Sequence, residues 1–495
     1  MICVSIGRTR HKMVRLEHEA LAQQGAELVE LRLDWLARLP DLGRLLVDRP
    51  TPVVVTARRQ ADHGRWMGDE KQRQTLLRAA IVGGAEYVDL EVDIAHEIPR
   101  YGSTKRIVSH HDFDETPDDL EEIYARMLET DCDIIKLVTM ANSPHDMVRM
   151  LKLVSTADRP TIGFCMGELG IPSRILCGKY GSPFTYAAFS SEREMAPGQI
   201  SFAEMKSIYR FNQIRPKTRV FGVVGDPIAH SLSPLIHNQA FEHEEIDAVY
   251  IPFRVPEDQF ADTLEAFEWL QVEGYSVTIP HKQSALAYAA ERDEFATTIG
   301  AANTLYRDTT HAGHATNTGC DAALASIPQG LVQGGGVGDS LAGGTALILG
   351  AGGVARAVAL GLVRAGADLT ITNRSHKRAK ALAEELGCHH TQWENRGSVS
   401  PNILVNCTAV GMHPNVEESP FPMNWLDEGM LVFDTVYNPE NTLLLKEARQ
   451  RGCHTVSCIE IFVRPAAGQF GGFPRGPRRQ EVMRAAIRKG ISPLR

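Results

Sequence analysis

The chain has 495 residues, of which 43% are hydrophobic and 23% are charged, and its formal net charge is −9. This length predicts about two or three domains, and the composition excludes wholesale disorder. A negative net charge without a Lys/Arg-rich block argues against binding of nucleic acid. The nine cysteines form no Cys-x-x-Cys pair, so we expect a reducing compartment and neither a disulfide framework nor a cysteine zinc site.

Targeting and membrane signals are weak. The first residues show no basic segment followed by a long apolar core, so we expect no signal peptide. The most apolar stretch, 345–363, is rich in glycine and contains Arg356, which favours a buried strand, turn and helix over a membrane span. These features predict a cytoplasmic enzyme.

Residues 1–190 repeat one pattern eight times. Short apolar runs rich in β-branched residues lie at 2–6, 28–33, 53–56, 87–92, 106–109, 134–138, 161–165 and 184–188. Segments of helical periodicity lie between most of them, at 17–24, 72–82, 119–129 and 146–156. Apolar strands that alternate with helices indicate parallel pairing with both faces covered. The pattern therefore predicts a (β/α)8 barrel.

A second α/β pattern follows a short polar joint at 212–216. Strands are expected at 220–224, 248–253, 275–279, 303–306, 345–349, 368–373, 403–406, 431–434 and 454–457. Helices are expected at 355–365 and at 478–489. The glycine-rich segment 330–344 is typical of a flexible connection. The whole chain is therefore expected to be α/β.

Polar side chains gather at the carboxyl ends of the predicted barrel strands, where barrel enzymes carry their active sites. They are Ser5, Glu30, Arg32, Arg58, Glu91, Asp93, His110, His111 and Lys136. Ionisable groups in a barrel mouth have a desolvation cost, so a cluster of them indicates function. The structural alternative is an ion-pair network that only closes the top of the barrel.

Lys136 lies in the apolar segment Asp-Ile-Ile-Lys-Leu-Val. Burial disfavours the charged form of its amine and favours attack on a carbonyl carbon. The imine would withdraw electrons, and His111 is the natural base for the adjacent carbon-bound proton. The alternative is an ion pair of Lys136 with Glu91 or Asp93. A metal is not expected, because His110 and His111 are neighbours in a strand and face opposite sides.

Arg32, Arg58 and Arg174 indicate an anionic substrate, held by forked hydrogen bonds to a carboxylate. Residues 1–210 resemble the type I 3-dehydroquinate dehydratases. The matching stretches are Glu-Leu-Arg-Leu-Asp at 30–34, Val-Thr-Ala-Arg at 55–58, Ser-His-His-Asp-Phe at 109–113, Ile-Ile-Lys at 134–136, Met-Gly-x-x-Gly-x-x-Ser-Arg at 166–174 and Ala-Pro-Gly-Gln at 196–199.

This resemblance implies that Lys136 forms the imine with the substrate ketone and that His111 moves the proton as water is lost. It also implies substrate contacts from Ser5, Glu30, Arg32, Arg58, Arg174 and Gln199. Two positions depart from the family pattern. Asp62 stands where a glutamate usually lies near the histidine, and Met195 stands where a serine usually contacts substrate. Neither replaces the lysine or the histidine, so we expect dehydration to survive.

A dinucleotide fingerprint, Leu-Ile-Leu-Gly-Ala-Gly-Gly-Val-Ala-Arg at 347–356, lies between a predicted strand and a predicted helix. Gly350 permits the tight turn, and Gly352 lets the backbone approach the pyrophosphate. Two arginines at the end of the next strand suit a 2′-phosphate, which predicts NADP over NAD. The predicted cofactor-binding residues are Gly350, Ala351, Gly352, Gly353, Val354, Asn373, Arg374, Ser375 and Arg378. A purely structural turn and a solvated charge patch are the alternatives.

Residues 219–495 resemble the shikimate dehydrogenases. The matching stretches are Ser-Leu-Ser at 231–233, Ser-Val-Thr-Ile-Pro-His-Lys at 276–282, Ala-Asn-Thr at 302–304, Asn-Cys-Thr-Ala-Val-Gly-Met at 406–412 and Asp-Thr-Val-Tyr-Asn-Pro at 434–439. The resemblance implies hydride transfer between NADP and 3-dehydroshikimate, with Lys282 transferring the proton. It also implies substrate contacts from Ser231, Ser233, Thr278, Asn303 and Tyr437.

Departures are larger in this half. The family reads Asn-Thr-Asp, whereas this chain has Gly319 in the aspartate position and Asp321 two residues later. In a helix such positions point about 200° apart, so Asp321 reaches the substrate only through a local shift of register. Pro465 replaces a glutamine that contacts substrate, Cys458 a glycine and Ile461 a methionine. These changes predict a reductase that is slow, altered in substrate or silent.

In this order the two halves resemble the bifunctional 3-dehydroquinate dehydratase/shikimate dehydrogenases. The expected domains are a barrel at 1–213, a substrate-binding lobe at 219–325, a Rossmann lobe at 340–465 and a closing segment at 466–495. The expected reactions are dehydration of 3-dehydroquinate and NADPH-dependent reduction of 3-dehydroshikimate to shikimate, two steps towards aromatic amino acids.

Two alternatives for the second half are a dehydrogenase for quinate or another ring acid and a non-catalytic binding module. The alternative for the barrel is another lysine–imine enzyme, such as an aldolase. In every case we expect small-molecule partners, without nucleic acid or membrane.

Overall fold

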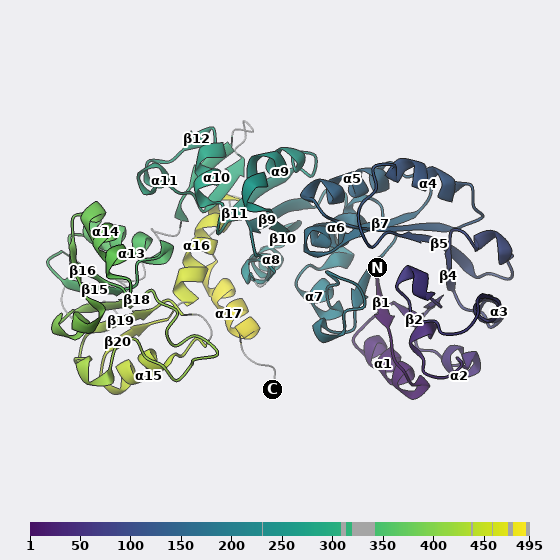
Figure 1. Ribbon diagram of the computed structural model, residues 1–495, viewed down its shortest axis with the longest axis horizontal. Helices are drawn as coiled ribbons and strands as arrows, with labels where there is room; N and C mark the ends of the chain where they lie inside the picture. Colours follow the sequence, from purple (N-terminus) through teal and green to yellow (C-terminus); the bar gives the residue numbers. More distant parts are fainter. Residues whose placement is uncertain are drawn as a thin grey trace. The chain divides into compact units, whose positions relative to one another are not determined.

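Eight parallel strands make up the first sheet of the computed structural model (Figure 1). They are β1 (Ile2–Ile6), β2 (Leu28–Arg32), β3 (Val53–Thr56), β4 (Tyr87–Glu91), β5 (Lys105–His111), β6 (Ile134–Met140), β7 (Thr161–Met166) and β8 (Thr185–Ala188). Their order is β7-β6-β5-β4-β3-β2-β1-β8, so the last strand returns to pair with the first. All the ladders are parallel. This arrangement confirms the predicted (β/α)8 barrel.

A side chain closes the junction between β7 and β8. No backbone ladder joins these two strands, all of whose residues are described. Instead, the backbone N–H of Gly163 donates to Ser182 Oγ at 3.3 Å, and that hydroxyl donates to the carbonyl of Thr161 at 2.8 Å. The buried serine therefore satisfies backbone groups that a strand pair would otherwise satisfy.

Helices follow the barrel strands along the chain. They are α1 (His11–Gln23), α2 (Leu42–Leu46), α3 (Glu70–Val82), α4 (Leu120–Leu128), α5 (Pro144–Ser155), α6 (Ile171–Leu176) and α7 (Phe202–Ser207). Three of them begin at capping boxes, at Asp69, Ser143 and Ser201, in which two side chains satisfy orphan backbone N–H groups. The first helix begins at His11, and the predicted range 17–24 starts too late. The prediction missed the first turns because they are mostly polar and exposed and show no apolar pattern.

The structure describes residues 1–229, 231–307, 313–318, 342–436, 439–457, 459–473 and 479–491. It forms two compact units. The first consists of Met1–Pro234, Glu245–Glu273 and Thr278–His281, and the second of Leu235–Glu244, Gly274–Val277 and Lys282–Arg495. The domain limits expected from the sequence stay predictions.

The second sheet is mixed. Its strands are β9 (Arg219–Gly225), β10 (Ala248–Arg254), β11 (Val272–Val277), β12 (Glu291–Arg292), β13 (Thr304–Arg307) and β14 (Gly313–Thr316), in the order β10-β9-β11-β13-β14-β12. The helices α8 (Ser233–His243), α9 (Phe260–Ala266), α10 (Lys282–Tyr288) and α11 (Glu294–Ile299) belong to this region. The sequence missed β12 and β14, which are short and carry polar residues. It also predicted 275–279 for the strand that spans Val272–Val277, three residues too late at its start.

The third sheet is parallel and has the order of a dinucleotide-binding fold. It contains β15 (Thr345–Leu349), β16 (Asp368–Thr372), β17 (His389–Thr391), β18 (Ile403–Asn406), β19 (Leu431–Asp434) and β20 (His454–Val456). The order β17-β16-β15-β18-β19-β20 is the doubly wound 3-2-1-4-5-6 arrangement, with its switch point between β15 and β18. The associated helices are α13 (Gly353–Arg364), α14 (His376–Leu386), α15 (Leu443–Gln450), α16 (Ile459–Gly472) and α17 (Gln480–Ile491).

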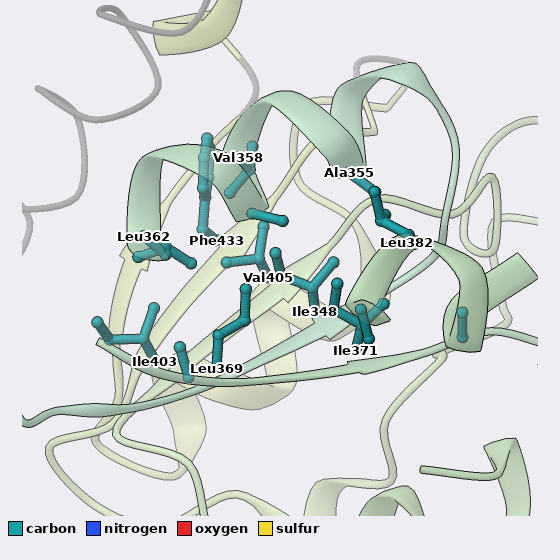
Figure 2. Packing of buried hydrophobic residues seen from close by; sticks show 14 of the residues in the cluster. Ile348, Ala355, Val358, Leu362, Leu369, Ile371, Leu382, Ile403, Val405 and Phe433 are labelled. Atoms are coloured by element: carbon teal, nitrogen blue, oxygen red, sulfur yellow. The ribbon is translucent and has the colours of Figure 1, made fainter. Parts of the chain in front are cut away.

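One buried cluster fastens helices to one face of this sheet (Figure 2). Ile348, Val405 and Phe433 extend from three neighbouring strands, and Val358 and Leu362 of α13 pack against them. Burial of an apolar side chain of this size contributes roughly 1.5–3 kcal/mol. The cluster therefore holds the start of α13 close to the end of β15, where the glycine fingerprint lies.

Candidate active sites

A pocket with an empty volume of about 570 Å³ lies at the carboxyl ends of the barrel strands. All eight barrel residues predicted as a site line it: Ser5, Glu30, Arg32, Arg58, His111, Lys136, Arg174 and Gln199. The lining also includes Asp62, His63, Phe113, Val138, Phe164, Met166, Tyr186, Met195 and Ala196. The lining residues are spread along the first 200 positions of the chain. They meet in one place because the carboxyl ends of barrel strands converge.

Lys136 lines this pocket and is 5% exposed. Its Nζ donates to Asp89 Oδ2 at 3.0 Å, lies 3.9 Å from Glu30 Oε1, and lies 4.0 Å from the ring centroid of Tyr186. The alternative that Lys136 pairs with Glu91 or Asp93 is wrong. Side chains two apart in a strand face the same way, and Asp89, two residues before Glu91 in β4, is the one that reaches the amine.

Asp89 is the hub of a buried charge network. Arg58 Nη2 donates to Asp89 Oδ1 at 2.7 Å, Ser109 Oγ donates to the same oxygen at 2.7 Å, and Arg58 Nη1 donates to Glu91 Oε1 at 2.9 Å. Burial alone would raise the pKa of Asp89, but Arg58 and then Lys136 outweigh burial and hold that pKa well below its ordinary value. Asp89 is therefore ionised and balances the cations beside it. The sequence reasoning missed it, although its place on the inward face of β4 was visible.

His111 is the last residue of β5 and is partly buried. Burial, followed by the nearby charges of Arg58 and Lys136, holds the pKa of His111 well below its ordinary value. Its imidazole is therefore neutral at pH 7 and able to accept a proton. The chain beyond it is fixed, because the backbone N–H of Asp112 donates to the carbonyl of Val138 at 2.9 Å.

The three predicted arginines differ in their partners. Arg32 donates to both carboxylate oxygens of Asp34, at 3.0 and 2.8 Å, and Arg58 is held by Asp89 and Glu91. Arg174 is 2% exposed and has no acidic partner among the described residues. It donates to the carbonyl of Pro197 at 3.3 Å, and its Nε has no hydrogen-bond partner. Burial lowers the pKa of Arg174 to about 10. A bound anion would supply the missing partner.

The two departures from the dehydratase pattern also line the pocket. Arg59 donates to Asp62, and its two terminal nitrogens donate to Asp93 at 2.7 and 3.1 Å. The carboxylate of Asp62, whose side chain is shorter than the usual glutamate, is thus bound by Arg59. The backbone N–H of Met195 donates to Gln199 Oε1 at 2.9 Å, which orients the amide of Gln199.

The predicted residues of the second site fall in both compact units. In the first unit, Ser231 Oγ accepts from the backbone N–H of Ser233 at 3.3 Å, and Thr278 N donates to the carbonyl of Val224 at 2.9 Å. In the second unit, Lys282 begins α10, and Asn303 Oδ1 accepts from Thr318 N at 2.9 Å.

Some predicted residues lie outside the described residues, namely Asp321 and Tyr437, together with the departures Gly319 and Cys458. The side chain of Ile461 is likewise not described. Pro465 lies inside α16, and its carbonyl accepts from Thr318 Oγ1 at 3.3 Å.

Gln469 of α16 was missed by the sequence reasoning. Its Oε1 accepts from Ser276 Oγ at 2.6 Å, and its Nε2 donates to the carbonyl of Asn303 and to Thr304 Oγ1, each at 3.2 Å. It is 6% exposed. This glutamine therefore connects α16 to β11 through Ser276 and to the start of β13 through Asn303 and Thr304.

The fingerprint turn has the shape that a dinucleotide needs. Gly350 has φ 120°, and a Cβ there would lie 2.8 Å from the carbonyl oxygen of Cys407. At Gly352 and Gly353 a Cβ would meet nothing within 4 Å, so open space lies before the start of α13, where a helix N-terminus favours phosphate. Ala351 lies in the same turn, and Val354, in the first turn of α13, is 45% exposed.

The second cofactor segment follows β16. Asn373 Nδ2 donates to the carbonyl of Ser375 at 3.2 Å, which fixes this turn. Arg374 and Arg378 are exposed, and within the described residues neither forms an ion pair. Two free guanidinium groups beside a dinucleotide turn fit a 2′-phosphate.

Three family models match the chain. They are the type I 3-dehydroquinase model over residues 2–216, the shikimate dehydrogenase substrate-binding domain over 223–305, and the shikimate/quinate 5-dehydrogenase model over 336–403. Together with the barrel and the Rossmann sheet, these models define the class: a type I dehydroquinase fused to a shikimate dehydrogenase.

The curated relatives narrow this class. A bifunctional 3-dehydroquinate dehydratase/shikimate dehydrogenase of Arabidopsis thaliana, described as chloroplastic, is 38% identical over 97% of this chain and 83% of its own length. An NADP⁺-dependent shikimate dehydrogenase of Methanothermobacter thermautotrophicus is 38% identical over 56% of this chain and 99% of its own length. The chain belongs to the family of bifunctional 3-dehydroquinate dehydratase/shikimate dehydrogenases.

Solved structures resemble the second half. A shikimate dehydrogenase in complex with NADP⁺ has a TM-score of 0.51 and 31% identity, and it covers 56% of this chain and 97% of that chain. A quinate dehydrogenase from Corynebacterium glutamicum in complex with NAD has a TM-score of 0.50 and 26% identity, and it covers 55% of this chain and 99% of that chain.

Proposed function

We propose that the barrel pocket is the place where this enzyme dehydrates 3-dehydroquinate, with Lys136 as the nucleophile and His111 as the proton carrier. The enzyme is a 3-dehydroquinate dehydratase and an NADP-dependent shikimate dehydrogenase in one chain, and it catalyses two successive steps of the shikimate pathway. The observation that carries the proposal is the buried amine of Lys136, held by Asp89 in a pocket that also contains a neutral imidazole.

The dehydration follows from these groups. The Lys136 amine attacks the ketone carbon, and loss of water leaves a protonated imine that withdraws electrons from the neighbouring carbon. His111 takes the proton from that carbon, and the electron pair moves towards the imine nitrogen. The hydroxyl on the next carbon then leaves with a proton returned by His111, as water. Hydrolysis of the imine releases 3-dehydroshikimate and restores the amine.

The remaining pocket residues are proposed to hold the ring. Arg174 binds the substrate carboxylate, because it is the predicted arginine without an acidic partner among the described residues. Gln199, whose amide is oriented by Met195, and the polar residues Ser5, Glu30, Arg32 and Arg58 bind the ring hydroxyls. Excluding water from this pocket strengthens each of these contacts.

Borohydride reduction tests the assignment of the nucleophile. The full chain is mixed with 3-dehydroquinate and sodium borohydride, digested, and its peptides are weighed. We expect the mass of the reduced ring on the peptide that contains Lys136, and no such mass when 3-dehydroquinate is omitted. A ring attached to a different lysine, or none at all while turnover continues, contradicts the proposal.

In the dehydrogenase half, NADPH supplies a hydride to the carbonyl carbon of 3-dehydroshikimate. Lys282 is proposed to transfer the proton to the carbonyl oxygen, and Ser231, Ser233, Thr278, Asn303, Asp321 and Tyr437 are proposed to bind the ring acid. The fingerprint residues from Gly350 to Val354 hold the pyrophosphate, and Asn373, Arg374, Ser375 and Arg378 hold the phosphorylated ribose.

Replacing both Arg374 and Arg378 by Ala tests this last assignment. We expect the KM for NADPH to rise by roughly 30-fold, because two charged contacts to the 2′-phosphate are lost. The KM for NADH should not change. Lys377→Ala removes a charge from the same helical turn and serves as the control. An equal rise in the KM for NADPH in the Lys377→Ala variant would mean that the overall positive charge, rather than a phosphate site, governs the choice of cofactor.

Gly350→Ala tests the fingerprint turn. A Cβ at this position would lie 2.8 Å from a backbone carbonyl, which has no flexible end to move aside. We expect at least a 10-fold loss of NADPH affinity, measured by fluorescence titration. Gly387→Ala is the matched control, since Gly387 has φ 68° but no atom within 4 Å of an added Cβ. Loss of affinity in both variants would indicate backbone strain alone.

We also propose a cytoplasmic location. Among the described residues, no helix combines the length and apolar character needed to cross a bilayer. The seven described cysteines, Cys3, Cys132, Cys165, Cys177, Cys388, Cys407 and Cys453, are all free thiols, which is typical of a reducing compartment. Fractionation of the source cells, followed by detection of the chain, tests this location.

A further inference from the structure

His63 adopts a backbone conformation that residues other than glycine rarely adopt. Its φ is 57° and its ψ is 21°, in the left-handed region. Within the described ranges, five non-glycine residues have a positive φ, and His63 alone among them lines the barrel pocket. Such a conformation persists only where the surrounding structure fixes it.

The loop between β3 and α3 is anchored on both sides of His63. Before it, the side chain of Arg59 binds Asp62 and Asp93. After it, the backbone N–H of Arg65 donates to Asp34 Oδ2 at 3.0 Å, and the Arg65 guanidinium lies 3.5 Å from the ring centroid of Trp35. The backbone at His63 is therefore held by the loop, which sets the direction in which its side chain leaves the chain.

Two imidazoles stack on the same phenyl ring. The centroid of His63 lies 4.1 Å from that of Phe113, with an angle of 22° between the rings. The centroid of His111 lies 5.9 Å from that of Phe113, with an angle of 15°. Within the described residues, the His111 ring has no hydrogen-bond partner, and the carboxylate of Asp62, expected near that ring, is bound by Arg59. Packing is thus what orients the His111 ring.

We propose that His63 is a positioning residue for the dehydration: it packs on Phe113, and Phe113 in turn holds the His111 imidazole at the angle from which it takes the substrate proton. The inference rests on the proposed role of His111. It explains why an imidazole is kept in a conformation that suits glycine better, since a glycine at this position would leave Phe113 uncovered.

The same stack limits the access of water to His111. Four groups act on the proton affinity of His111 from the surrounding strands: Arg58 after β3, Asp89 on β4, His110 on β5 and Lys136 on β6. These charges stay in place when His63 is replaced, whereas burial decreases. The pKa of His111 then rises towards its ordinary value, because less desolvation opposes the charged form. His111 must be neutral to act as a base, so a higher pKa means that activity is lost at a higher pH. The acidic limb of the profile of kcat against pH therefore moves to higher pH.

Three variants of the full chain separate the ring from the backbone. His63→Asn tolerates the left-handed conformation but lacks a ring, His63→Gly removes the steric cost, and His63→Phe keeps a stacking face. We expect the Asn and Gly variants to lose about five-fold in kcat, with little change in KM. Their acidic limbs should move up by about 0.5 pH unit. The Phe variant should keep kcat within about two-fold of the parent.

Thermal unfolding distinguishes positioning from stability. Because glycine adopts a positive φ without steric cost, His63→Gly should not lower the unfolding temperature of the chain although it lowers kcat. A Phe variant that is as slow as the Asn variant overturns the proposal, because the ring face would then be irrelevant.

A double-mutant cycle with Phe113→Leu tests the route of the effect. If His63 acts through Phe113, His63→Asn should have almost no further effect on kcat in the Phe113→Leu background. An undiminished five-fold loss there overturns the proposal. Borohydride trapping is run on every variant. Trapping on Lys136 in all of them, with kcat unchanged, contradicts this inference alone, whereas failure of trapping in the parent contradicts the proposed nucleophile itself.

Discussion

Replacement of Lys136 by Met is expected to abolish dehydration, with a loss of kcat of roughly four orders of magnitude or more. Methionine keeps most of the length of the side chain but has no amine, so it cannot form an imine. The fold should tolerate the change, since Asp89 keeps its bonds to Arg58 and Ser109. The measurement is the appearance of the conjugated product at saturating 3-dehydroquinate.

The dehydrogenase half supplies the internal control for this variant. Reduction of 3-dehydroshikimate by NADPH should proceed at the parental rate, because Lys136 has no part in it. His111→Asn is a second comparison. It should retain borohydride trapping on Lys136 while losing about 10²- to 10⁴-fold in kcat. A Lys136→Met protein that still dehydrates 3-dehydroquinate at the parental rate would refute the imine mechanism.

Replacement of Arg58 by Met is expected to lower the free energy of unfolding of the barrel by about 3–5 kcal/mol. Arg58 is 4% exposed and balances Asp89 and Glu91, which would be left buried with fewer cations. Hydrogen–deuterium exchange of peptides from β3 to β5 reports this loss locally. Dehydration should fall as well, because the charges around Lys136 and His111 change.

The pH dependence of the Arg58 effect has a definite sign. In the parent, the pKa of Asp89 lies below its value in the unfolded chain, which is about 3.9. The stabilisation from its ionised form is therefore complete above that value and is lost as the pH falls towards the folded pKa. The difference in the free energy of unfolding between the parent and the Arg58→Met variant should become smaller below about pH 4.

Arg59→Met is the control for this variant. Its side chain is 28% exposed and pairs with Asp62 and Asp93 near solvent, so the expected loss is below about 1 kcal/mol. A similar loss in both variants would show that the buried position of Arg58 confers no special stability.

Much of the architecture was predictable because its signals are local. Eight apolar runs followed by helical segments indicated the barrel, since parallel strands buried on both faces must be apolar throughout. The glycine fingerprint at 350–353 indicated the Rossmann turn for the same kind of reason, because its glycines are neighbours in the chain and lie between a predicted strand and a predicted helix. Short strands such as β12, β14 and β17 escaped prediction, since they carry polar residues and owe their conformation to a neighbouring strand.

The residues that line the barrel pocket were largely predictable as well, because position at a strand end and a resemblance to the type I dehydratases both pointed to them. Their pairing was not. The sequence alone offered Glu91 or Asp93 as partners for Lys136, and Asp89 proved to be the partner because it lies on the inward face of β4 within reach of β6. Gln469 was invisible for the same reason, since its partners lie more than 160 residues away along the chain.

The amino-acid sequence by itself determined the two folds and the choice of NADP, and it pointed to the lysine and the histidine that are proposed to react, because each of these signals depends on residues close together in the chain. The tertiary structure alone decided which charges neutralise one another, which buried arginine has no acidic partner among the described residues, and that His63 reaches Phe113. Those features depend on distances between strands and loops that lie far apart in sequence, and electrostatic and packing energies change steeply over a few ångströms.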